Sequence, residues 1–169
     1  SNRGWPTPNP AGGRGRPGST SPTTMVIRSP RGRRTSIRLV HSAATHVGRV
    51  RHSNQDRHGS VEGLCVLADG MGGHRGGEVA ASLAVSTTLA RFDGPSRIGL
   101  VRAVVAANRA ILEKSLANED LLGMGTTICA IAAVVGESGV GGLAVVNVGD
   151  SRVYRYAGGG LTQVTEDHS

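Results

Sequence analysis

The stretch LADGMGG, residues 67–73, places one acid, Asp69, directly before a cluster of glycines. A carboxylate at the end of a strand can bind a divalent cation such as Mg²⁺ or Mn²⁺, which prefers carboxylate, carbonyl and water oxygens. Gly70 lets the main chain approach that cation and offer its own carbonyl oxygen. The stretch therefore predicts a metal-binding corner. The alternative from the same residues is that Asp69 caps the helix that follows.

Two known phosphate-binding loops share this order of strand, glycines and helix, and neither fits. The dinucleotide fingerprint G-x-G-x-x-G has Arg75 where its third glycine belongs. The P-loop G-x-x-x-x-G-K-[ST] has Glu78 where its lysine should neutralise phosphate. An acid at the strand end would also repel a phosphate bound directly by the backbone. Phosphate binding through cations is therefore the preferred interpretation.

Further polar and glycine-rich stretches lie before and after the first one. They are RVRHSNQD (49–56), GMGTT (123–127), VVNVGDSRVYRY (145–156) and LTQVTEDHS (161–169). Together with DGMGGH and VGDSR, they resemble the metal-dependent protein serine/threonine phosphatases of the PP2C (PPM) family, and most strongly the bacterial members. The resemblance covers residues 38–169 and corresponds to the N-terminal portion of such a phosphatase.

The resemblance implies a role for each matched residue. Asp69 would bridge two Mn²⁺ or Mg²⁺ ions, Gly70 would give its carbonyl to one of them, and Asp56 would bind near them directly or through water. Asp150 would accompany a third ion, as in bacterial members. Arg51 matches the arginine that grips the substrate phosphate, and a guanidinium fork suits that role. The implied catalytic residues are thus Asp69 and Arg51.

The implied activity is hydrolysis of phosphoserine and phosphothreonine in proteins by a metal-activated water. Two cations lower the pKa of a bridging water and neutralise phosphoryl oxygens, so no covalent intermediate is needed. This agrees with the sequence, because Cys65 and Cys129 lie in strand-like runs and not in a reactive loop. The implied partners are phosphoproteins, including serine/threonine kinases and their targets.

Three departures from the family pattern bear on activity. Gln55 and Met71 stand where eukaryotic members carry a glutamate and a histidine, although bacterial members share the methionine. The chain also stops at EDHS, before the later aspartates that complete the family's metal site. A cation that needs about six oxygen ligands is poorly held by those that remain. We therefore expect an active parent protein and a weak or inactive 169-residue chain.

Two other functions stay open at this point. One is a non-catalytic phosphatase-like module that binds a signalling partner. The other is nucleic-acid binding through RSPRGRR, residues 28–34, whose arginines can contact phosphates. Nucleic-acid binding is disfavoured because no aromatic residues interleave with these arginines, and a solvated linker accounts for them equally well.

The elements that must position these residues follow from apolar periodicity. The expected order is one or two strands over 36–48, a loop over 49–60, a strand over 61–70, helices over 78–92 and 96–120, and strands over 125–135 and 141–150 with two more behind them. Consecutive helices between runs of strands favour an α+β fold with an antiparallel sheet. The resemblance implies a β-sandwich flanked by helices, incomplete at its C-terminus, and its open edges would permit self-association.

The second expected helix is strongly amphipathic. Ser96 is its expected N-cap. The stripe expected to face the core consists of Ile98, Val101, Val105, Leu112 and Leu116.

Residues 1–35 differ in composition from the rest of the chain. Residues 1–36 hold seven arginines and no acid, whereas the remaining residues hold twelve basic and twelve acidic side chains. The net charge of +7 therefore belongs to the N-terminal segment. Because this Arg/Gly/Pro-rich segment has few apolar residues, we expect a disordered tail over 1–35 and the phosphatase portion over 36–169.

Neither a membrane nor an oxidising compartment is indicated. The chain contains no run of about 18 apolar residues, so no membrane association is expected. Neither cysteine has a second Cys or His at metal-ligand spacing, which favours free thiols in a reducing cytoplasm.

Overall fold

The computed structural model describes residues 23–28, 37–72, 75–136 and 139–168. Its main element is an antiparallel sheet in the order β1-β6-β5-β3-β2, and the short strand β4 pairs with the end of β3. The strands are β1 (Thr23–Arg28), β2 (Asp56–Val61), β3 (Leu64–Met71), β4 (Gly125–Thr126), β5 (Ile128–Val135) and β6 (Gly141–Val148). Strand β3 pairs with β2 on one side and with β5 and β4 on the other, so its end is held from both sides.

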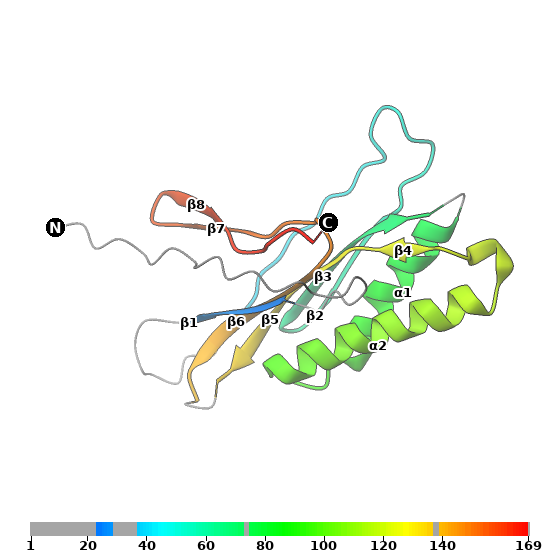
Figure 1. The fold of residues 1–169 in the computed structure, drawn as a ribbon. Helices are drawn as coiled ribbons and strands as arrows, with labels where there is room; N and C mark the ends of the chain where they lie inside the picture. Colours follow the sequence, from blue (N-terminus) through cyan, green and yellow to red (C-terminus); the bar gives the residue numbers. More distant parts are fainter. Residues whose placement is uncertain (1–22, 29–36, 73–74, 137–138, 169) are drawn as a thin grey trace, which may run out of the picture.

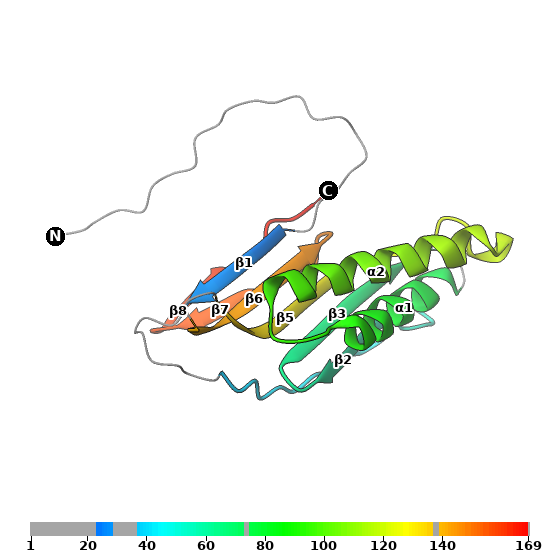
Figure 2. The ribbon, with the colours of Figure 1, turned by 90° about the horizontal axis from the view of Figure 1, so that it is seen from below.

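Two helices, α1 (Gly76–Arg91) and α2 (Arg97–Leu116), lie side by side across one face of the sheet (Figures 1 and 2). The short helix η1 (Glu119–Leu121) follows α2. The core between helices and sheet consists mainly of small aliphatic side chains, among them Leu64, Val66, Ala68, Ala80, Ala81, Ala84, Leu100, Ala130, Ala132, Ala144 and Val146. Such side chains let the helices approach the sheet closely. No helix in the described ranges has the length and apolar character needed to span a membrane.

A hairpin of β7 (Tyr154–Ala157) and β8 (Gly160–Gln163) lies on the side of the sheet away from the helices (Figure 1). Its eight strand residues are exposed. The hairpin forms the beginning of a second layer above the main sheet. The predicted α+β fold, with an antiparallel sheet flanked by helices, is therefore confirmed.

One strand lies inside the segment that was predicted to be a disordered tail. Residues 23–28, TTMVIR, form β1 and pair with β6 from Thr23↔Asn147 to Arg28↔Gly142. The prediction was wrong for these six residues because average composition hides a short run of strand-forming residues. The edge of β6 supplies the backbone partners that the run needs. The other residues of 1–35, including most of RSPRGRR, lie outside the described residues.

The region before β3 also differs from the prediction. Residues 37–55 contain neither helix nor strand, whereas β2 occupies part of the expected loop. Strand β2 lies at one end of the described strand order, where polar side chains can face solvent while the backbone pairs with β3. A polar sequence therefore did not exclude a strand here.

Helix α2 confirms its predicted cap and contradicts its predicted buried face. The Ser96 hydroxyl accepts a hydrogen bond from the Gly99 N–H at 2.9 Å. The buried face carries Leu100, Ala103, Val104, Ala107 and Ile111, whereas Ile98, Val105, Leu112 and Leu116 of the predicted stripe are exposed. The alanine-rich face permits closer packing against α1 and the sheet, and this packing outweighs the larger apolar area of the stripe.

Candidate metal centre

Two acids meet where β2 begins and β3 ends. Asp56 and Asp69 lie directly opposite each other in the strand register. The pKa of the Asp69 carboxyl is raised, first by burial, then by the charge of Asp56 and a hydrogen bond with it, and then by the charge of Asp150. The nearby Arg51 acts in the opposite direction and lowers this pKa. Asp56, Asp150 and Arg51 are thus all near enough to influence the charge of Asp69.

Gly70 lies where the strand and the first turn of α1 touch. A Cβ atom on Gly70 would lie 2.1 Å from the carbonyl oxygen of Gly77, and one on Gly77 would lie 2.6 Å from Oε1 of Gln55. The Gly70 N–H also donates to the carbonyl of Gln55 at 3.3 Å. Gly70 and Gly77 therefore allow the two backbones to approach closely.

The backbone of Asp69 is held by the GTT stretch after α2. The Thr127 N–H and the Thr126 hydroxyl both donate to the Asp69 carbonyl, each at 2.9 Å. The Asp69 N–H donates to the Thr127 hydroxyl at 3.1 Å. Because both backbone groups are bound, the direction in which the Asp69 side chain leaves the strand is fixed.

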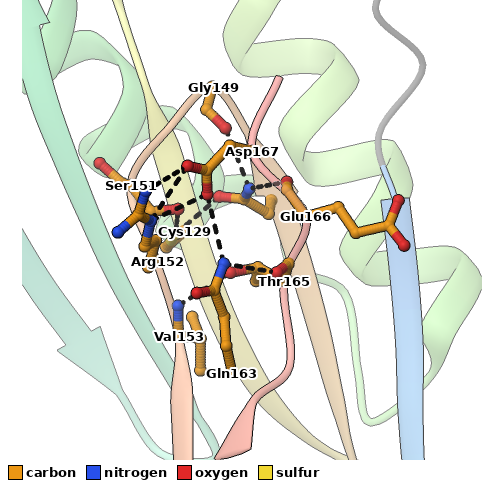
Figure 3. Close-up of polar contacts among 10 residues, drawn as sticks. Cys129, Gly149, Ser151, Arg152, Val153, Gln163, Thr165, Glu166 and Asp167 are labelled. Carbon is orange, nitrogen blue, oxygen red and sulfur yellow. Dashed lines mark hydrogen bonds and ion pairs between the residues drawn. The ribbon is translucent and has the colours of Figure 1, made fainter. Parts of the chain in front are cut away.

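Asp150 follows β6 at a turn that is tied to the end of the chain. Gly149 has φ +101°, which favours glycine, and its carbonyl accepts from Asn147 Nδ2 and from the His168 N–H, both at 3.1 Å. Buried Asn147 also donates to the Glu166 carbonyl at 3.2 Å and accepts from the Cys129 thiol at 2.8 Å. These contacts join β5, the turn after β6 and residues 166–168. Cys129, Gly149 and Glu166, which take part in them, are labelled in Figure 3.

The same turn carries an ion pair on its outer side. The Arg152 guanidinium binds the Asp167 carboxylate, with Nε 3.0 Å from both carboxylate oxygens (Figure 3). The hydrogen bond from Arg152 lowers the pKa of Asp167. The Gln163 amide donates to the same carboxylate at 3.3 Å. Asp167 is therefore engaged in holding the turn.

The possible ligands at this end of the sheet are of the chemical types that hard cations prefer, but they are few. Carboxylates and a backbone carbonyl are the ligands that Mg²⁺ and Mn²⁺ prefer, and a cation would relieve the repulsion that raises the pKa of Asp69. Within the described residues, however, no group of three or more His, Cys, Asp or Glu side chains is arranged to hold a metal ion. Asp56, Asp69 and Asp150 thus influence one another electrostatically without forming a complete metal site.

The structure excludes the alternative role of Asp69 as a helix cap. Helix α1 has Arg75 at its N-cap position, and no side-chain cap hydrogen bond is found there among the described residues. Asp69 therefore does not cap the helix. The sequence analysis did not identify Thr127 and Asn147. Each is a polar residue inside an otherwise apolar strand run, and this pattern could have indicated them. Both side chains are at most 3% exposed.

Comparisons with known proteins agree with this geometry. The sequence model of the protein phosphatase 2C family matches residues 45–169. The serine/threonine phosphatase stp of Listeria monocytogenes is 38% identical over 138 residues, covering 74% of this chain and 53% of that protein. The serine/threonine protein phosphatase PstP of Mycobacterium tuberculosis is 40% identical over 139 residues, covering 79% of this chain and 26% of that protein.

Solved structures give the same result. The crystal structure of Mycobacterium tuberculosis PstP/Ppp has a TM-score of 0.62 at 34% identity and covers 86% of this chain and 54% of that one. The catalytic domain of PstP in complex with two manganese ions has a TM-score of 0.62 at 35% identity, covering 86% and 55%. The chain belongs to the protein phosphatase 2C family. It spans about half the length of the stp phosphatase and of the solved PstP structures.

Proposed function

We propose that residues 36–169 form the N-terminal portion of a phosphatase domain that hydrolyses phosphoserine and phosphothreonine in proteins, with Mn²⁺ or Mg²⁺ as cofactor. The observation that carries this proposal is the position of Asp69 directly opposite Asp56 at the sheet end that bears Gly70, with Asp150 near enough to raise the pKa of Asp69. Family membership, and a related phosphatase domain that was solved with two manganese ions, support the reaction and the metal.

Each converging group has a proposed part in holding cations. The Asp69 carboxylate would contact both ions, the Gly70 carbonyl one of them, and Asp56 would bind directly or through water. Asp150 would contribute to a third ion. Bound cations would supply an acidified water and neutralise phosphoryl oxygens. The hydrogen bonds from Thr126 and Thr127 keep the Asp69 backbone in place while this occurs.

Arg51 is the proposed ligand of the substrate phosphate. Its side chain is exposed on the loop before β2, and it is close enough to Asp69 to lower the pKa of that carboxyl. A guanidinium can donate two parallel N–H bonds to phosphoryl oxygens and so orient the phosphorus atom. Asp69 and Arg51 are therefore the proposed catalytic residues.

The proposed partners are phosphoproteins, among them serine/threonine kinases and their targets. We place the protein in the cytoplasm, in keeping with Cys65 and Cys129, which are both free thiols. Strands β1 and β2 lie at the two ends of the described strand order, and their unpaired backbone groups offer edges for self-association.

A second candidate function rests on the small number of metal ligands. Because no group of three or more potential ligand side chains is assembled within the described residues, the 169-residue chain by itself would act as a binding module with weak or no turnover. The complete domain, meaning a form that spans the full length of the related phosphatase domains, would carry the phosphatase activity.

The test is hydrolysis of p-nitrophenyl phosphate and of a phosphothreonine peptide by both forms. We expect turnover by the complete domain with Mn²⁺, loss with chelator, and loss of most activity in Asp69→Asn. Asp93→Asn, which removes an exposed acid from the α1–α2 loop, is the matched control and should stay active. Full activity of Asp69→Asn would contradict the metal assignment. Equal rates for the two forms would exclude the need for further ligands.

A further inference from the structure

We propose that Thr127 is a positioning residue of the candidate metal centre, because its hydroxyl joins the segment that carries Asp69 to the segment that carries Asp150. The inference deepens the proposed function, since it names what sets the spacing between two of the proposed metal ligands. Thr127 itself would touch neither metal nor substrate. It is 3% exposed and lies between β4 and β5.

Thr127 first binds the backbone of Asp69 through two hydrogen bonds. The Thr127 N–H donates to the Asp69 carbonyl at 2.9 Å, and the Thr127 hydroxyl accepts from the Asp69 N–H at 3.1 Å. One residue therefore binds both main-chain groups of the proposed bridging aspartate. Rotation of the Asp69 backbone would break at least one of these bonds.

Thr127 also forms a bond to the other acidic segment. Thr127 Oγ1 lies 2.7 Å from Oγ of Ser151, the residue directly after Asp150. A hydroxyl has one hydrogen and two lone pairs, so Thr127 can accept from the Asp69 N–H and still share a hydrogen bond with Ser151. The Ser151 carbonyl in turn accepts from the Cys129 thiol at 3.4 Å. The Asp69 and Asp150 segments are thus joined through a single oxygen atom.

The methyl group of Thr127 completes the contact. A Cβ atom on Gly149 would lie 2.7 Å from Cγ2 of Thr127, so this methyl packs against the turn that leads into Asp150. Valine would keep the methyl contact and lose the hydroxyl. Serine would keep the hydroxyl and lose the methyl. The two substitutions therefore separate hydrogen bonding from packing at this position.

Loss of the hydroxyl should weaken cation binding. Removing a residue that orients a metal ligand typically lowers metal affinity by about ten- to a hundredfold. Removing the hydroxyl from Thr127 also leaves the Asp69 N–H without its hydrogen-bond acceptor. We therefore expect Thr127→Val to bind Mn²⁺ about ten- to a hundredfold more weakly, and Thr127→Ser to stay within about threefold of the original protein.

The experiment is a Mn²⁺ titration of the complete domain, followed through the electron paramagnetic resonance signal of the free ion. The matched control is Thr88→Val, because Thr88 is fully buried and its hydroxyl has no hydrogen-bond partner in the described part of the chain. We expect this control to bind Mn²⁺ normally. Normal binding by Thr127→Val, or equal losses in Thr127→Val and Thr127→Ser, would overturn the proposal.

Two further measurements separate the role of Thr127 from a folding defect and from the proposed phosphatase function. Ser151→Ala removes the bond between the segments from its other end, so its effect on Mn²⁺ affinity and that of Thr127→Val should not add; additive effects would overturn the link. In the 169-residue chain without metal, the Asp69 amide should exchange with solvent faster in Thr127→Val than in Thr127→Ser. This prediction does not depend on whether the protein is a phosphatase. Equal exchange rates would contradict the two hydrogen bonds between Thr127 and the Asp69 backbone.

Discussion

Gly70→Ala should be one of the most damaging single-methyl substitutions in the chain. The added Cβ would lie 2.1 Å from the Gly77 carbonyl oxygen and 2.4 Å from the Gly77 carbonyl carbon, whereas ordinary contacts begin at 3.4 Å. Both distances fall short of an ordinary contact by at least one ångström, and both obstructing atoms belong to the backbone. The clash can be removed only if β3 and the first turn of α1 move apart. This movement would also shift the Gly70 carbonyl.

Insertion of a methyl group into a well-packed site typically costs about 1–3 kcal/mol, and we expect at least the upper value because no side chain can rotate away. For a chain of this size that corresponds to a fall in melting temperature of roughly 6–12 °C. The assay is thermal unfolding followed by circular dichroism. Gly160→Ala is the matched control, because its nearest atom would be 3.8 Å away, and it should change stability by less than about 0.5 kcal/mol. An unchanged melting temperature for Gly70→Ala would refute the close approach of strand and helix.

Other predictions test the site, the thiols, the turn and the edge strand. In the complete domain, Arg51→Ala should raise KM about ten- to a hundredfold with little change in Mn²⁺ affinity, since it removes charged hydrogen bonds to phosphate; an unchanged KM rejects the role. Burial raises the pKa of Cys129 to about 11, so iodoacetamide at pH 8 should label it only after unfolding, as mass spectrometry can show. In the folded protein, Arg152 lowers the pKa of Asp167. The stability that this pair contributes should therefore be present above the ordinary aspartate pKa of about 4 and fall as the pH drops below it. Arg152→Ala should remove this pH dependence in urea titrations. Deletion of residues 1–28 should uncover the edge of β6 and lower the melting temperature relative to deletion of residues 1–22, and equal values would contradict the pairing of β1.

Much of the candidate site could be predicted because its residues lie in local motifs with fixed spacing. Asp69 and Gly70 lie just before the last residue of β3, and Asp150 lies in the turn directly after β6; apolar periodicity indicates both strands. Ser96 could be predicted as a cap because capping depends on neighbouring residues. The proximity of Asp69 to Asp150 could be expected only from the family resemblance, since β3 and the turn after β6 are far apart in sequence and no local pattern relates them.

The remaining features depend on pairing and packing between distant segments. Strand β1 exists because the distant strand β6 offers a free edge, which the local sequence does not show. Strand β2 forms a hairpin with β3 across Glu62 and Gly63, and it was missed because its residues are mostly polar. The buried face of α2 was mispredicted because periodicity identifies apolar stripes without showing which one fits α1 and the sheet. Thr127 was overlooked because its hydrogen bonds reach residues 58 and 24 positions away.

The most direct test of the central claim is anomalous diffraction at the manganese edge from crystals of the complete domain grown with Mn²⁺. The account predicts two strong peaks, with the Asp69 carboxylate in contact with both ions and the Gly70 carbonyl in contact with one. Asp56 should lie beside them directly or through a water, and Asp150 should lie near any third peak. Manganese bound elsewhere, with Asp69 and Gly70 contacting no ion, would contradict the assignment of this sheet end as the metal centre.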